Sequence, residues 1–201
     1  MSLIIDHRIG LSKCLGAVIM GLLIVSGRFW SLHYPLIGQG LSVLGWALSG
    51  IGAFGRIWCA VYIAGYKDDS LVTDGPYSMC RNPLYFFSMT GALGVGLATE
   101  TLLIPGLILM FFVLYYPVVI KREETRLARQ HCFKYSCYLE TVPAFFPRFS
   151  MLREPVNYAV NPVVLKRHLM DAIWFIWLCG LMSFITWLQA AGLLPRWLLL
   201  F

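Results

Sequence analysis

Two adjacent carboxylates, Glu123 and Glu124, follow directly after an apolar stretch of the chain. Carboxylates at the exit of a membrane span are costly unless they are solvated or paired. Arg122, Arg126 and Arg129 lie close by in sequence, which favours a solvated helix with ion pairs three and four residues apart. Since neighbouring helical residues differ by about 100°, we expect one carboxylate to face inward and the other to stay in water. A solvated helix surface and a partly buried site both remain open.

A second segment with chemical potential lies earlier, between two apolar stretches. It contains the strong turn signal Asp74-Gly75-Pro76-Tyr77, and Asn82-Pro83 then begins the next apolar stretch. Proline is favoured in the first turn of a helix and disfavours helix at the residue before it. The start of that helix presents free N–H groups that suit an anionic group such as a carboxylate. An ordinary interfacial loop with a capped helix explains the same residues.

The composition places both segments beside a membrane. Of the 201 residues, 59% are hydrophobic and 13% are charged, which is about half the charged fraction of a soluble domain. We therefore expect a single all-α domain over residues 1–201, a polytopic integral membrane helical bundle. The net charge is +6, and because the basic residues lie beside apolar segments, they favour lipid headgroups over nucleic acid as partners.

Five apolar stretches predict about five transmembrane helices. The expected spans lie near residues 14–32, 36–64, 83–99, 101–120 and 172–194. Glu100 alone separates the third and fourth spans, which predicts a tight helical hairpin. Small residues recur three and four positions apart and should let helices approach closely in lipid, namely Gly45, Ser49, Gly52, Gly55, Gly91, Ala92 and Gly96.

Basic residues predict the orientation of these spans. With five spans, the N-terminus and the segments 65–82 and 121–170 share one side, and these regions carry most of the Lys and Arg. We expect this side to be cytosolic, in the inner membrane of a bacterium or an ER-type membrane of a eukaryote. The first apolar run lacks a small-residue cleavage site, so we expect it to be retained.

Two further features concern the end of the chain and its cysteines. Prolines and aromatics from Pro143 to Pro162 predict an irregular stretch on the membrane surface, which either closes over a ligand or is a plain linker. His168 and Asp171 are expected to cap the last span. The six cysteines show no CxxC spacing, so we expect neither disulfides nor a metal site.

Taken in order, the motifs of this chain resemble the isoprenylcysteine carboxyl methyltransferase family, and phospholipid N-methyltransferases share related motifs. The resemblance covers about Lys67 to Pro147. It is carried by Leu71-Val72-Thr73-Asp74-Gly75-Pro76-Tyr77, Arg81-Asn82-Pro83-Leu84-Tyr85, Glu123-Glu124-x-x-Leu127, Tyr135-x-x-Tyr138 and Val142-Pro143. The combination, beside the right apolar spans, is more specific than any one motif.

The resemblance implies a cytosolic site for S-adenosyl-L-methionine, with S-adenosyl-L-homocysteine as product, built from segments 65–85 and 119–147. Glu123 matches the glutamate expected to bind the cofactor's amino group, as a carboxylate pairs with an ammonium. The other positions implied for the cofactor are Asp69, Ser70, Leu71, Val72, Tyr77, Asn82, Pro83, Leu84 and Tyr85. The implied acceptor is a lipophilic small molecule or lipid, with carboxylate O-methylation as the leading chemistry.

Methyl transfer from a sulfonium is an in-line displacement that needs an oriented acceptor and a dry pocket more than acid–base groups. We expect the catalytic residues to be Arg81, Arg122 and Glu124. Arg126 is a further electrostatic partner for the acceptor. His131 is a further base for an acceptor that must lose a proton.

Three positions depart from the family pattern. Asn82 stands where the family has histidine and does not titrate near neutrality. His131-Cys132 replaces Phe-Gly, and Val119 falls where the family has the arginine that engages the prenylcysteine carboxylate. Two other classes stay open: an NADPH-dependent membrane sterol or enone reductase, which would need extra basic residues for the 2′-phosphate, and a non-catalytic lipid-binding or scaffold protein.

Overall fold

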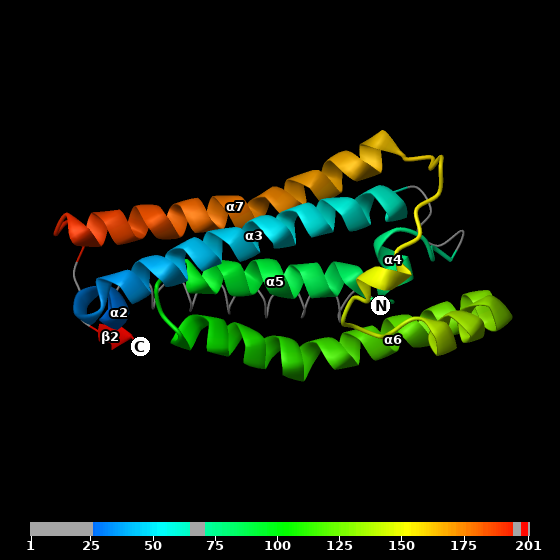
Figure 1. Cartoon of the computed structure of the whole chain (residues 1–201), viewed down its shortest axis with the longest axis horizontal. Helices are drawn as coiled ribbons and strands as arrows, with labels where there is room; N and C mark the ends of the chain where they lie inside the picture. The colour runs from blue at the N-terminus through cyan, green and yellow to red at the C-terminus, as the bar shows by residue number, and fades with distance from the viewer. Residues whose placement is uncertain (1–25, 65–70, 195–197, 201) are drawn as a thin grey trace, which may run out of the picture.

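The computed structural model describes residues 26–64, 71–194 and 198–200. Within them, four long helices form an elongated bundle (Figure 1). The helices are α3 (Pro35–Ile63), α5 (Pro83–Leu97), α6 (Leu103–Thr141) and α7 (Pro162–Ala190). The shorter elements are α2 (Phe29–His33), α4 (Pro76–Met79), the 3-10 helix η1 (Phe149–Met151) and the strands β1 (Ser26–Arg28) and β2 (Leu198–Leu200). The prediction of a helical membrane bundle is confirmed.

Three of the described helices are long and apolar enough to cross a membrane. They are α3, α7 and the part of α6 from Leu103 to His131. Helix α5 is apolar but has only 15 residues, a length of about 22 Å against a hydrocarbon core of about 30 Å. The protein is therefore an integral membrane protein, and five spans with a cytosolic N-terminus remain a prediction.

The first predicted span, near 14–32, is only partly covered because residues 14–25 lie outside the described residues. Its last part is not one continuous helix. Strand β1 pairs in parallel with β2, with Ser26 opposite Leu198 and Arg28 opposite Leu200. The backbone groups of β1 are thus satisfied by the far end of the chain rather than by a helical turn, and the short α2 follows.

Helices α3 and α5 approach each other through small residues, as predicted. A Cβ atom on Gly52 would collide with the backbone of Gly91, and one on Gly94 would collide with the backbone of Ser49. The Ser49 hydroxyl also donates to the Gly91 carbonyl oxygen at 3.3 Å. In lipid, where apolar burial between helices supplies little drive, such close backbone contact is what holds helices together.

The tight hairpin predicted between α5 and α6 is confirmed. Glu100 adopts a left-handed conformation with φ of 59°, which reverses the chain in a few residues. On one side of it, the Thr99 hydroxyl donates to the Gly96 carbonyl at 2.6 Å and contacts the Thr101 hydroxyl at 2.9 Å. Gly96 lies against the backbone of Pro105 in α6, so the absence of a side chain at this position lets the two helices of the hairpin pack closely.

Helix α6 continues to Thr141, well past the predicted end of the fourth span at residue 120. The apolar composition stops near Lys121, but the charged residues that follow are good helix formers, so the helix continues into a polar environment. Pro117 lies inside α6 and removes one backbone donor. Proline is a common cause of helix kinks, and α6 is visibly bent in Figure 1.

Helix α7 begins at Pro162, ten residues before the predicted start at 172. The Asn161 side-chain oxygen accepts hydrogen bonds from the N–H groups of Val163 and Val164 at 3.0 and 3.4 Å. Asparagine before proline is a strong helix start, so this cap was visible in the sequence. The prediction that His168 and Asp171 cap the last span is wrong, because both lie inside α7.

Candidate active site

The two segments singled out in the sequence meet at one end of the bundle, around a cavity of about 180 Å³. Its walls come from the end of α3, the chain leading into α5, the polar half of α6 and the start of α7. The lining residues are Ile63, Leu71, Val72, Tyr77, Arg81, Asn82, Leu84, Tyr85, Glu123, Glu124, Arg126, Leu127, His131, Tyr135, Tyr138 and His168. The cavity thus has apolar walls with two carboxylates among them.

Glu123 is anchored in this cavity by a tyrosine from the other segment. The Tyr85 hydroxyl donates to Glu123 Oε2 at 2.8 Å. Arg126 Nη2 lies 3.8 Å from the second oxygen, Oε1, and the Tyr116 ring packs edge-on against Tyr85. The Glu123 side chain is still 35% exposed, so its orientation is held while part of the carboxylate remains accessible.

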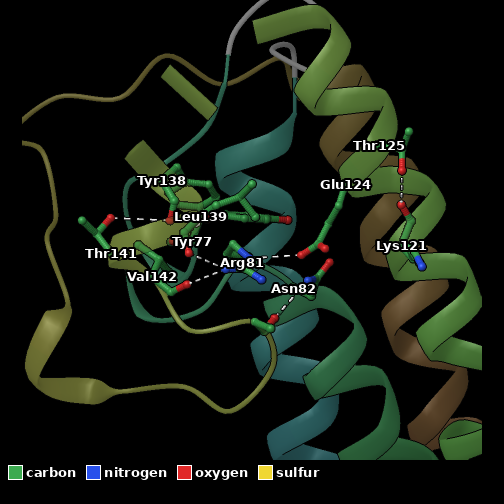
Figure 2. A network of polar contacts seen from close by, with 11 residues as sticks. Tyr77, Arg81, Asn82, Lys121, Glu124, Thr125, Tyr138, Leu139, Thr141 and Val142 are labelled. Carbon is green, nitrogen blue, oxygen red and sulfur yellow. Dashed lines mark hydrogen bonds and ion pairs between the residues drawn. The ribbon is translucent and has the colours of Figure 1, made fainter. Parts of the chain in front are cut away.

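Glu124 also lines the cavity, but it is paired. Arg81 Nε lies 3.1 Å from Glu124 Oε1, and the two side chains are only 15% and 24% exposed. Arg81 Nη1 donates further to the carbonyl oxygens of Leu139 at 2.8 Å and Val142 at 3.0 Å (Figure 2). The expectation that only one of the two glutamates would face inward is wrong, because positions 100° apart on α6 reach different groups of the same cavity.

The turn before α5 is joined to the end of α6 by further polar contacts. Arg81 N donates to the Pro143 carbonyl at 2.8 Å, and Asn82 Nδ2 donates to the Ala144 carbonyl at 2.9 Å. The Tyr138 hydroxyl donates to the Tyr77 carbonyl at 2.7 Å. Asn82, which replaces the family histidine, therefore fixes the chain that follows α6 through an uncharged hydrogen bond.

The segment between α6 and α7 forms hydrogen bonds with the same turn. Gly75 N donates to the Arg153 carbonyl at 2.7 Å, and Arg153 N donates to the Ser78 hydroxyl at 2.9 Å. Arg148 N donates to the Met79 carbonyl at 3.0 Å. The stretch is irregular apart from η1, as predicted. It is bonded to Gly75 on one side of Tyr77 and to Ser78 and Met79 of α4 on the other.

Two buried polar atoms of the cavity, the Tyr77 hydroxyl and His131 Nε2, have no hydrogen-bond partner among the residues that the structure describes. Burial raises the pKa of Tyr77 well above its usual range, so the phenol stays protonated and remains a donor. Burial also raises the pKa of Tyr135 to about 12. An unpaired buried polar atom costs free energy, so the Tyr77 hydroxyl and His131 Nε2 together indicate a place for a polar ligand.

The cavity gathers most of the residues that the sequence singled out. Those for the cofactor are Leu71, Val72, Tyr77, Asn82, Leu84, Tyr85 and Glu123, beside Arg81 and Glu124. Pro83 is buried in the first turn of α5 and Arg122 is exposed on α6, and neither lines the cavity. Asp69 and Ser70 lie outside the described residues. His168 of α7 was missed, and only tertiary packing brings it to the site.

Comparison with known proteins places this site in a family. The profile of the family described as phospholipid methyltransferase matches residues 15–132, which include the first segment and the second segment as far as Cys132. The chain belongs to the phospholipid methyltransferase family. The resemblance drawn from the motifs is thereby confirmed.

Two metal-resistance proteins are similar to this chain over nearly its whole length. The nickel-cobalt-cadmium resistance protein NccN of Alcaligenes xylosoxydans xylosoxydans is 35% identical over 199 residues, covering 99% of this chain and 92% of that protein. The cobalt-zinc-cadmium resistance protein CzcN of Cupriavidus metallidurans is 35% identical over 190 residues, covering 94% and 86%. No solved structure matches significantly.

Proposed function

We propose that this protein transfers the methyl group of S-adenosyl-L-methionine to an acceptor held in the membrane, from the cytosolic face. The observation that carries the proposal is the contact between Tyr85 and Glu123, at 2.8 Å. These residues belong to two motif segments far apart in sequence, and both line one cavity at the polar end of the helices. The family of the chain supports the same chemistry.

The residues of the cavity fit the parts of this cofactor. Glu123, oriented by Tyr85 and partly exposed, would pair with the ammonium of the methionine part. Leu71, Val72 and Leu84 supply an apolar wall, and the buried Tyr77 hydroxyl supplies a donor that has no partner in the described part of the chain. When bound, the cofactor supplies an electrophilic methyl group on a sulfonium, and the chain contributes orientation and exclusion of water.

The residues predicted to be catalytic divide into different roles. Arg81 and Glu124 pair with each other, and Arg81 also holds two carbonyls of α6, so we assign both to positioning. Both Arg122 and Arg126 are exposed, and of the two Arg126 lines the cavity. A cation beside the site favours an anionic acceptor, and an ionised carboxylate needs no base, so we propose carboxylate O-methylation of a lipophilic acceptor.

A labelled-methyl assay tests this proposal. Purified protein in lipid vesicles receives methyl-labelled S-adenosyl-L-methionine and a total lipid extract, and label in the organic phase is measured before and after mild alkali. Release of labelled methanol by alkali is expected for a methyl ester, whereas an N-methylated headgroup keeps its label. Glu123→Gln should lower cofactor affinity about ten- to a hundredfold, because a charge-assisted bond is lost, while Glu140→Gln on the exposed face of α6 should not.

Calorimetry separates this function from the other enzyme class. Binding of S-adenosyl-L-homocysteine but not of NADPH is expected. Binding of NADPH alone would overturn the proposal in favour of a reductase, and binding of neither would leave a lipid-binding or scaffold protein.

The similarity to NccN and CzcN gives the proposal a physiological setting. Because those two proteins are named for resistance to nickel, cobalt, zinc and cadmium, we propose that methyl transfer by this chain supports growth in the presence of such metals. Expression of the wild-type chain in a metal-sensitive strain should raise the tolerated cadmium or cobalt concentration, and Glu123→Gln should not. Equal protection by both would separate metal resistance from the cavity.

A further inference from the structure

The cavity has a second polar end that the proposed function leaves unassigned. His131 lies eight residues beyond Glu123 on α6, which is about 12 Å along the helix axis. Its Nε2 atom is buried and has no hydrogen-bond partner within residues 26–64, 71–194 and 198–200, and the side chain lines the cavity. It occupies a position where the resembled family has an apolar residue, so the family pattern does not account for it.

The position of His131 on α6 indicates which part of a ligand it meets. Relative to Glu124 it is seven residues on, two helical turns, and so it projects from nearly the same face. Leu127 lies between them on this face and also lines the cavity. The cavity therefore runs along α6 from a carboxylate, past an apolar side chain, to an imidazole nitrogen.

Distance from the lipid distinguishes where the lipophilic acceptor binds from where the water-soluble cofactor binds. His131 lies eleven residues beyond Ile120, where the apolar composition of α6 ends, and this is about 16 Å further along the helix. An acceptor that dissolves in the bilayer reaches the cavity from the apolar side. The end near His131 is thus suited to the water-soluble cofactor rather than to the lipophilic acceptor.

We propose that His131 is a cofactor-binding residue whose Nε2 atom forms a hydrogen bond with the adenosine part of the cofactor. This inference rests on the proposed function, which assigns the ammonium end to Glu123. An imidazole nitrogen either donates or accepts, and adenosine offers both ribose hydroxyls and ring nitrogens. The bond would satisfy a buried atom that has no partner within the described part of the chain.

Two ligands that differ only in the amino-acid part test this assignment. 5′-Methylthioadenosine contains the nucleoside and sulfur of S-adenosyl-L-homocysteine but lacks its ammonium and carboxylate. Calorimetry on the full chain in detergent should show that His131→Phe weakens both ligands by a similar factor, about five- to tenfold for one hydrogen bond. Glu123→Gln should weaken S-adenosyl-L-homocysteine and leave methylthioadenosine unchanged.

Matched variants distinguish a bond from a packing effect. His131→Gln keeps a polar group near the position of Nε2 and should retain most of the affinity for methylthioadenosine. Gln130→Leu, on the exposed face of α6, should leave both affinities unchanged. If His131→Phe fails to fold, ring-nitrogen NMR of the wild type decides, because methylthioadenosine should shift the His131 resonance.

The outcomes separate this inference from the proposed function. If the wild type binds S-adenosyl-L-homocysteine and His131→Phe leaves the affinity for methylthioadenosine unchanged, the assignment of His131 is overturned and the proposed function stands. An unshifted His131 resonance with methylthioadenosine bound has the same meaning. If the wild type binds neither ligand, both the proposed function and the assignment are overturned.

Discussion

The contact between α3 and α5 and the junction between the Arg81 turn and α6 hold the same bundle by opposite means. At the first, Gly52 and Gly91 bring two backbones together because neither has a side chain. At the second, one long side chain, that of Arg81, reaches Glu124 and two backbone carbonyls. The α3–α5 contact forms because these glycines lack side chains, and the junction with α6 forms because Arg81 has a long side chain with several donors.

The difference follows from the surroundings of each contact. Between apolar helices in lipid, stability comes mainly from close packing, so small residues are favoured. At the polar end, the last carbonyls of α6 have no partner within the helix and need donors from elsewhere. Arg81 supplies donors to Leu139 and Val142, and in doing so it places α6 beside the turn that carries Tyr77. An atom added at Gly52 should therefore destabilise the contact between α3 and α5. Loss of the Arg81 donors should destabilise the junction with α6.

The largest effect is expected from adding one methyl group to the helix contact. Gly52→Ala places a Cβ atom against the Gly91 backbone, which has no room to yield, and should destabilise the protein by about 3 kcal/mol. Gly50→Ala is the matched control, since nothing lies within 4 Å of a Cβ atom at that position. It should be neutral or stabilising, because alanine favours helix more than glycine does. Thermal unfolding in detergent, followed by tryptophan fluorescence, measures both; equal effects would contradict the close contact.

A somewhat smaller effect is expected from removing the donors of the junction. Arg81→Met leaves the Leu139 and Val142 carbonyls and the Glu124 carboxylate without their partner, at a cost of about 2 kcal/mol, reduced by the partial exposure of Glu124. Cofactor affinity should fall as well, because the turn and α6 both line the cavity. Arg122→Met, on the exposed face of α6, is the control for loss of positive charge. Unchanged stability of Arg81→Met would show that the junction is held by other contacts.

The smallest effect on stability is expected at Tyr135, beside the junction, and it should appear only in alkaline solution. Burial, together with the Glu124 charge, raises the pKa of Tyr135 to about 12 from a usual value near 10. Since the unfolded phenol loses its proton first, this contribution to stability is complete below pH 10 and is lost as the pH rises to about 12. Tyr135→Phe should therefore flatten the fall in melting temperature between pH 10 and 12, whereas Tyr34→Phe, which removes an exposed phenol, should not. Parallel profiles of wild type and Tyr135→Phe would exclude a buried, shifted phenol.

Much of the helical framework was predictable because it depends on local patterns. Long apolar stretches, the small-residue spacing around Gly52 and the single polar break at Glu100 each require only neighbours in sequence. The predicted helix bounds were wrong where a helix extends beyond its apolar residues. Helix α6 outlasts its apolar part, and α7 starts at the Asn161-Pro162 cap rather than at its apolar part.

The sequence by itself determined that the chain is a helical membrane protein and which short motifs identify its family, because hydropathy, turn signals and motif order are properties of residues and their spacing. Only the tertiary structure decided how those motifs are used. It bonded Arg81, which lines the cavity, to the end of α6, and it bonded Tyr85 to Glu123. It also buried His131 Nε2 without a partner among the described residues. The physical reason is that hydrogen bonds between residues some 40 to 60 positions apart depend on how the helices pack, and no local pattern encodes that geometry.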